Sequence, residues 1–291
     1  MKVCAMLFAL ALLVSCREAG DKEGLVVGVS IAPQAWVVEG IAGESAEVVV
    51  CVPAGADPHS YEPGPEVMRA LSEADLYLTI GLPFEDQWLP RLRSANPDMR
   101  VEQMDAGLPR LMADGHGHIH SDGDPAEAEY GHPDPHVWMS CSNMRRMARN
   151  AAAVLDEIAP ETAPARASNL ARTLAEIDSV EARVRAILAE AGGRAFIALH
   201  PAYAYFADEF GLEQIALEVE GAEPTPSQLA EIIDLAGESG ASAVVVSPGF
   251  ATGAAEAVSM ELGIPVVPHD QLSTDWPGSM ESLASIIAEA R

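Results

Sequence analysis

The 291-residue sequence has few basic residues, four cysteines and no long hydrophobic run. Lysine and arginine number 17 against 44 aspartates and glutamates, and the net charge of −27 excludes nucleic acid as a partner, because phosphates would be repelled. The apolar run Val3–Val14 is shorter than the roughly 20 residues that a membrane-spanning helix needs. Hydrophobic residues still make up 49% of the chain, so most of it is expected to fold.

The first residues predict export and lipidation. Lys2 and the apolar run after it are typical of a secretory signal peptide over residues 1–15. The tetrapeptide Leu13-Val14-Ser15-Cys16 resembles a bacterial lipobox, which implies that Cys16 is acylated and that residues 16–24 form a tether. We therefore expect an extracytoplasmic lipoprotein, periplasmic or at the cell surface. The alternative is an ordinary cleaved signal peptide in which Cys16 has no role.

Two cysteines remain in the body of the mature chain, Cys51 and Cys141. A disulfide can persist in an oxidising compartment, so a bridge between these two residues is one expectation. Two free buried thiols are the equally weighted alternative.

Buried strands and helices alternate along the chain, which favours an α/β fold with mostly parallel sheets. Apolar β-branched runs predict strands at residues 25–31, 46–52, 76–80, 195–199, 243–246 and 264–267. Helical patterns occupy residues 65–74, 143–158 and 226–236, the last opened by a capping box of Thr225 and Gln228.

One long helix is predicted over Thr162–Ala191, ending at Gly192-Gly193, with strand-like runs in equal number on both sides. We expect two lobes, each a mostly parallel sheet flanked by helices: residues 25–160 and 192–291, joined by a linking helix at 161–191. A single doubly wound domain with one unusually long helix is the alternative. Residues 113–134 are expected to form a His-rich surface loop.

Three histidines and one aspartate stand where strands or turns end. His59 and His136 each close an Asp-Pro-His tripeptide, His200 follows the run 195–199, and Asp270 follows the run 264–267. Ligands of open α/β sheets bind outside the carboxyl ends of the strands, so these side chains can converge. Three imidazoles and a carboxylate suit a borderline ion such as zinc. Each Asp-Pro-His could instead be only a turn with Asp as its side-chain acceptor.

Four further histidines lie in the predicted loop: His116, His118, His120 and His132. Imidazoles on an acidic, flexible backbone are suited to loose, exchangeable metal capture. A solvated loop without a metal role is the alternative.

Several stretches resemble the solute-binding proteins of bacterial zinc and manganese ABC transporters. They are Gly55–Pro63, Ala74–Trp88, Asp134–Trp138, His200–Leu212, Glu218–Leu229 and Asp270–Trp276, in the order of the family. The resemblance implies two lobes joined by one long helix, with His59, His136, His200 and Asp270 as the metal ligands. The chain has Gln271 where the family often has proline, so a water or a loop histidine is the alternative to Asp270 as the fourth ligand.

The same resemblance implies a monomeric binding component, not an enzyme, that delivers Zn²⁺ to a permease in the cytoplasmic membrane. Manganese members typically carry a carboxylate where this chain has His200, and a His-rich loop is typical of zinc members. Manganese uptake is the alternative within the family. A secreted zinc hydrolase is the alternative outside the family, although the His-Glu-x-x-His and Gly-x-Ser-x-Gly motifs of hydrolases are missing. A surface adhesin or metal buffer that works without a permease is a third alternative.

Overall fold

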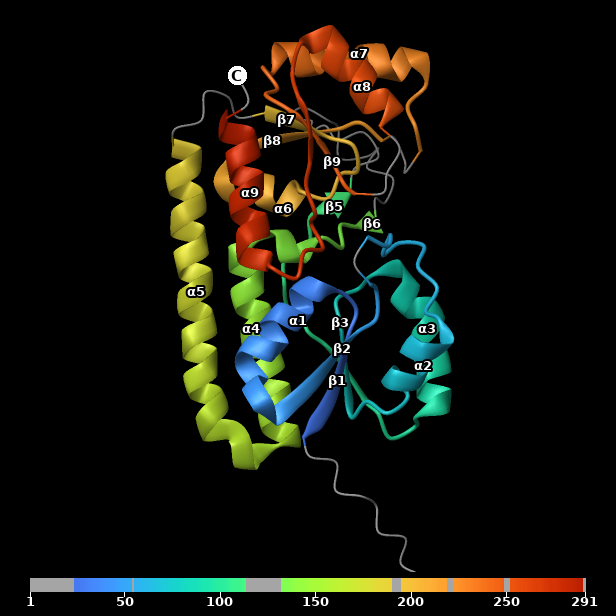
Figure 1. Ribbon diagram of the computed structural model, residues 1–291, viewed down its shortest axis with the longest axis vertical. Coiled ribbons are helices and arrows are strands. Elements are labelled where there is room, and N and C mark those ends of the chain that lie inside the picture. Colours follow the sequence, from blue (N-terminus) through green and yellow to red (C-terminus); the bar gives the residue numbers. More distant parts are fainter. Residues whose placement is uncertain are drawn as a thin grey trace, which may run out of the picture.

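The computed structural model describes residues 24–53, 55–113, 132–189, 195–218, 222–248 and 252–289. Two α/β lobes lie one above the other along the long axis of the molecule, and one long helix runs beside both (Figure 1). Two separate parallel sheets are present, so the two-lobe expectation is confirmed and the single doubly wound domain is wrong.

The first lobe is built on a four-stranded parallel sheet in the order β2-β1-β3-β4. Its strands are β1 (Leu25–Val29), β2 (Ala46–Val50), β3 (Leu76–Thr79) and β4 (Arg100–Gln103). Its helices are α1 (Ala32–Ala42), α2 (Pro65–Leu71), α3 (Pro83–Ala95) and α4 (Cys141–Ile158). The central strand β3 is buried at every residue, as expected for a strand covered on both faces.

The second lobe repeats this plan with the order β10-β9-β7-β8, again parallel. Its strands are β7 (Ala195–Ala198), β8 (Glu213–Ala216), β9 (Val244–Val246) and β10 (Val266–Pro268). Its helices are α6 (Ala204–Phe210), α7 (Pro226–Glu238), α8 (Gly253–Leu262) and α9 (Trp276–Glu289). The predicted capping box opens α7: the Thr225 hydroxyl accepts from the backbone N–H of Gln228, whose side chain accepts from the Thr225 N–H.

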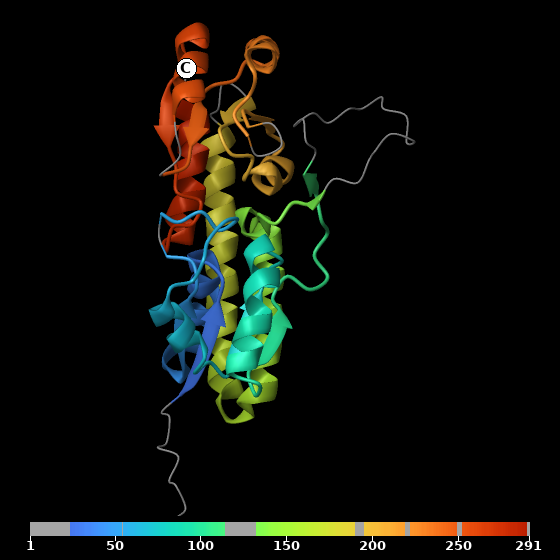
Figure 2. The same cartoon turned by 90° about the vertical axis from the view of Figure 1, so that its right-hand side faces the viewer.

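The linking helix α5 (Ala163–Ala189) has 27 residues, which corresponds to about 40 Å at 1.5 Å per residue. Figures 1 and 2 show it reaching from the end of the first lobe to the second. Ile177, Val180 and Val184 are fully buried on one face. The helix packs against α4 and α1 in the first lobe and against α9 in the second, so it is part of both cores.

One apolar cluster continues from the first lobe into the second. The ring of the half-buried Trp36 packs against this cluster, with its centroid 5.0 Å from that of the buried Trp276. The indole N–H of Trp276 donates to the backbone oxygen of Trp138 at 2.8 Å. A smaller cluster fills the space between the second sheet and helices α7 and α8. Because the lobes share a core, they are expected to resist wide opening.

No helix in the described parts of the chain has both the length and the apolar character needed to cross a membrane. The predicted signal peptide, residues 1–15, and the predicted lipidation site Cys16 lie outside the described residues. Both stay predictions.

Removing a buried contact on α5 should destabilise the whole protein. We expect Ile177→Ala to lower the free energy of unfolding by about 2 to 5 kcal/mol, because it leaves a cavity in the shared core. Ser179→Ala on the exposed face of the same helix should change it by no more than about 0.5 kcal/mol. Urea unfolding of the two variants measures both values, and equal effects would contradict this role of the helix.

Candidate metal centre

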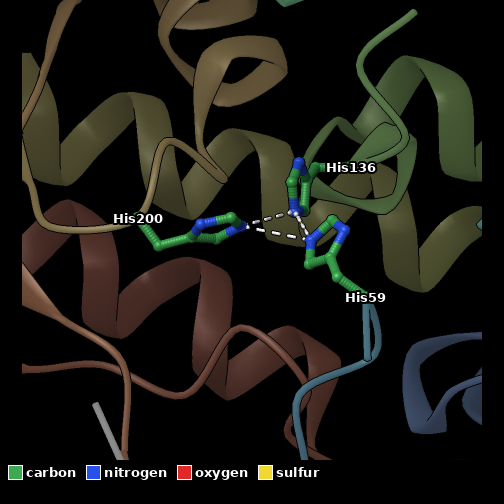
Figure 3. A group of neighbouring side chains, drawn as sticks. All are labelled: His59, His136 and His200. Atoms are coloured by element: carbon green, nitrogen blue, oxygen red, sulfur yellow. Dashed lines mark hydrogen bonds between the residues drawn. The ribbon is translucent and has the colours of Figure 1, made fainter. Parts of the chain in front are cut away.

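Three histidines from separate segments meet between the lobes (Figure 3). His59 lies in the loop after β2, His136 directly precedes a short 3₁₀ turn (Val137–Met139), and His200 follows β7. Their Nε2 atoms are 3.3 Å (His59 to His136), 3.2 Å (His59 to His200) and 3.3 Å (His136 to His200) apart. The expected convergence of the three imidazoles is therefore present.

The separations can be compared with those of a coordinated ion. Nitrogens bound to zinc at 2.0 to 2.1 Å in tetrahedral directions lie roughly 3.3 to 3.4 Å apart. The observed triangle is close to this spacing before any side chain moves. The three residues therefore fit a tetrahedral cation.

Two carboxylates set the orientation of two of the rings. The Asp134 carboxylate accepts from Nδ1 of His136 at 2.7 Å, and Glu218 accepts from Nδ1 of His200 at 2.9 Å. A proton on Nδ1 leaves the lone pair on Nε2, which faces the centre of the cluster in both residues. Neither Asp134 nor Glu218 is among the predicted site residues.

The repeated Asp-Pro-His tripeptide forms the same local turn twice. Asp57 accepts from the backbone N–H of His59 at 2.9 Å, and Asp134 accepts from the backbone N–H of His136 at 2.8 Å. The aspartate is thus a side-chain acceptor in both copies, as the turn interpretation expected. The turn and the histidine cluster occur together, so the two interpretations do not exclude each other.

Burial favours the neutral form of two of the imidazoles, those of His59 and His136. Burial, together with the smaller effects of the neighbouring His136 and His200, lowers the pKa of His59 to about 4. The pKa of His136 is also lowered, chiefly by burial, although the Asp134 carboxylate opposes that shift. Neutral imidazoles have free lone pairs, which is the state that a metal cation requires.

Helix α6 of the second lobe holds the segment that carries His136. The hydroxyl of Tyr205 donates to the backbone oxygen of Asp134 at 3.0 Å and accepts from the N–H of Leu111 at 3.1 Å. Four residues further on, Glu209 accepts from the N–H of Ser142 at the start of α4. Residues four apart lie on one face of a helix. One face of α6 therefore hydrogen-bonds to the segment both before His136, at Asp134, and after it, at Ser142.

Asp270 follows β10 and lines the same cavity as His59 and His200. Its Oδ1 accepts from the backbone N–H of Leu272 at 2.9 Å. Within the described residues, the compact group of donor atoms comprises the three histidines and does not include this carboxylate. Its ligand role stays a prediction.

The loop histidines fall mostly outside the described residues, which omit His116, His118 and His120. The two ends of the predicted loop form a short antiparallel pair, β5 (Met112–Ala113) and β6 (His132–Pro133). Asp134 follows this pair directly, so the ends of the loop adjoin the metal centre. The metal role of all four histidines stays a prediction.

The predicted bridge between Cys51 and Cys141 is not formed, since both are buried free thiols. The Cys51 thiol lies beside Tyr77, and its pKa is raised to about 12, chiefly by burial. Burial likewise raises the pKa of Cys141, which lies near Glu209. The two thiols therefore lie in different environments, and the structure agrees with the alternative of two free buried thiols.

The chain belongs to the family described as zinc-uptake complex component A, periplasmic (ZnuA), whose model matches residues 27–290. Members of this family are metal-binding solute-binding proteins, so the expectation that the chain is not an enzyme is confirmed. A crystal structure of ZnuA has a TM-score of 0.83 and 36% sequence identity, and the match covers 92% of this chain and 99% of that one.

Curated relatives include proteins named for both metals. The zinc-binding lipoprotein AdcA of Streptococcus pneumoniae is 25% identical over 275 residues, which cover 93% of this chain and 53% of AdcA. The chain thus spans about half the length of AdcA. The manganese-binding lipoprotein MntA of Halalkalibacterium halodurans is 29% identical over 252 residues, which cover 84% of this chain and 78% of MntA. Similarity alone therefore leaves the choice between zinc and manganese open.

The lowered pKa of His59 makes the stability of the metal-free protein depend on pH. Below about pH 6.5 the unfolded chain takes up a proton on this residue that the folded chain does not, until the pH nears 4. Acidification should therefore lower the free energy of unfolding, by up to about 1.4 kcal/mol per pH unit for this imidazole.

The comparison is between the metal-free wild type and His59→Asn, by urea unfolding at several pH values from 7.5 to 4.5. We expect a smaller dependence on pH in the variant. Equal slopes for the two proteins would contradict a neutral, buried His59.

Proposed function

We propose that the protein is the extracytoplasmic zinc-binding component of an ABC importer. The observation that carries this proposal is the triangle of Nε2 atoms of His59, His136 and His200, with separations of 3.2 to 3.3 Å. The cation is the cargo of the protein, held between the lobes and then passed to a permease in the membrane. Acylation of Cys16 would keep the protein near that permease.

The ligand chemistry favours zinc over manganese. Neutral imidazoles suit zinc, whereas manganese prefers carboxylate, carbonyl and water oxygens. His200 supplies a nitrogen from the second lobe, and the Glu218 carboxylate accepts a hydrogen bond from Nδ1 of this ring. Similarity to ZnuA and to the zinc-binding AdcA supports the same choice. Asp270, which lines the same cavity as His59 and His200, is proposed as the source of the fourth ligand atom.

Manganese uptake is the second candidate, because MntA is named as manganese-binding. Competitive titration of the metal-free mature protein against a chelator separates the two functions. We expect one tight site for zinc and much weaker binding of manganese. Equal or tighter manganese binding would favour the second candidate, and the lack of any tight site would contradict both.

Import is tested in the cell. A strain without this protein should fail to grow under zinc chelation, and growth should return with the wild-type gene but not with His59→Ala. Normal growth of the deletion strain would contradict a role in zinc uptake. Failure of zinc to restore growth, with rescue by manganese instead, would favour manganese as the cargo.

The two carboxylates behind the rings should matter for affinity. We expect Asp134→Asn and Glu218→Gln each to weaken zinc binding about 10- to 100-fold, because the amides no longer enforce a proton on Nδ1. Glu102→Gln changes a carboxylate on strand β4 that pairs with Arg100, away from the site, and serves as the control. Unchanged zinc affinity in both site variants would contradict this role of the carboxylates.

A further inference from the structure

Gln271 is a buried polar residue beside the histidine cluster. It is 5% exposed, and its Oε1 has no hydrogen-bond partner among the described residues. It lines the cavity that His59, His200 and Asp270 also line. An unpaired buried amide oxygen destabilises a protein, so its presence beside a ligand cavity points to a use in binding.

The backbone around Gln271 is held without the help of its side chain. The carbonyl of Gln271 accepts from the indole N–H of Trp138 at 3.0 Å. On one side the backbone oxygen of Asp270 accepts from the Ser279 hydroxyl at 2.8 Å, and on the other the N–H of Leu272 donates to the Asp270 carboxylate. The side-chain amide is therefore presented by a fixed segment and is available to a bound group.

The cavity is small and lies beside the histidine cluster. Its volume is about 20 Å³, which is enough for a single water molecule. Three imidazoles leave one position open on a tetrahedral cation. An oxygen ligand in that position could come from a water in this cavity or from Asp270, which lines it.

We propose that the side-chain amide of Gln271 is a positioning group of the metal centre, which hydrogen-bonds to the oxygen ligand that completes the coordination of the cation. This inference rests on the proposed function. The amide oxygen can accept from a metal-bound water, and the amide N–H can donate to a carboxylate. Gln271 thereby fixes the oxygen ligand as Asp134 and Glu218 fix two of the nitrogen ligands.

Gln34 provides a matched comparison within the same chain. It too is a buried glutamine, but its Oε1 accepts from the N–H groups of Ser30 and Ile31, and its Nε2 donates to the backbone oxygen of Leu78. Its amide therefore connects the start of helix α1 to strand β3 in the first lobe. The same substitution at the two glutamines should therefore have opposite consequences.

The experiment compares Gln271→Leu with Gln34→Leu in the mature protein, with zinc affinity measured by competition and the stability of the metal-free form measured by urea unfolding. We expect Gln271→Leu to weaken zinc binding about tenfold or more while metal-free stability stays equal or rises. Gln34→Leu should lower metal-free stability. Unchanged zinc affinity in Gln271→Leu, or a loss of metal-free stability like that of Gln34→Leu, would overturn the proposal.

A double-mutant cycle with Asp270→Ala separates the two sources of the oxygen ligand. If Gln271 acts through the Asp270 carboxylate, the Gln271→Leu effect on zinc affinity disappears in the Asp270→Ala background. If it acts through a water, the effect persists there. Both results support the proposal and assign the ligand. Weak zinc binding by the wild type would be a failure of the proposed function itself, and the wild-type titration detects it separately.

Discussion

Two hydrogen bonds, from His136 to Asp134 and from His200 to Glu218, decide what the histidine cluster can do. An imidazole with its proton on Nδ1 can offer Nε2 to a cation, whereas the other tautomer cannot. Burial works in the same direction, because it lowers the pKa of His59 and of His136 and so keeps both rings neutral. The site is thus preorganised by charge and burial together, before a cation arrives.

The scaffold explains why three segments so far apart in sequence meet with this accuracy. Helix α5 packs into both lobes, and a continuous apolar core that includes Trp276, with Trp36 packed against it, joins the two lobes. From the second lobe, Tyr205 and Glu209 hold the segment that carries His136. Such a molecule favours small adjustments of loops over wide hinge motion, which suits a cargo as small as one ion.

Much of this could be predicted from sequence, and the exceptions have physical causes. Central strands such as β3 are fully buried and mostly apolar, so they were predictable. The edge strands β4 and β8 contain polar residues such as Glu102 and Glu213, which leave no apolar run. The three histidines were predictable because each follows a strand or a recognisable turn. Asp134 and Glu218 were missed as ring partners, because their role depends on distances that spacing does not encode. The expected pairing of Cys51 with Cys141 rested on the number of cysteines left in the mature chain, which says nothing about their distance. Gln271 is a candidate positioning residue only because its amide oxygen lacks a hydrogen-bond partner, which sequence does not reveal.

The central claim is that three imidazoles bind the cation in a preformed, nearly tetrahedral arrangement. Zinc-edge X-ray absorption of the mature protein loaded with one equivalent of zinc tests it most directly. The account predicts a first shell of three imidazole nitrogens and one oxygen at about 2.0 to 2.1 Å. A first shell that contains sulfur, or fewer than three imidazoles, would contradict it.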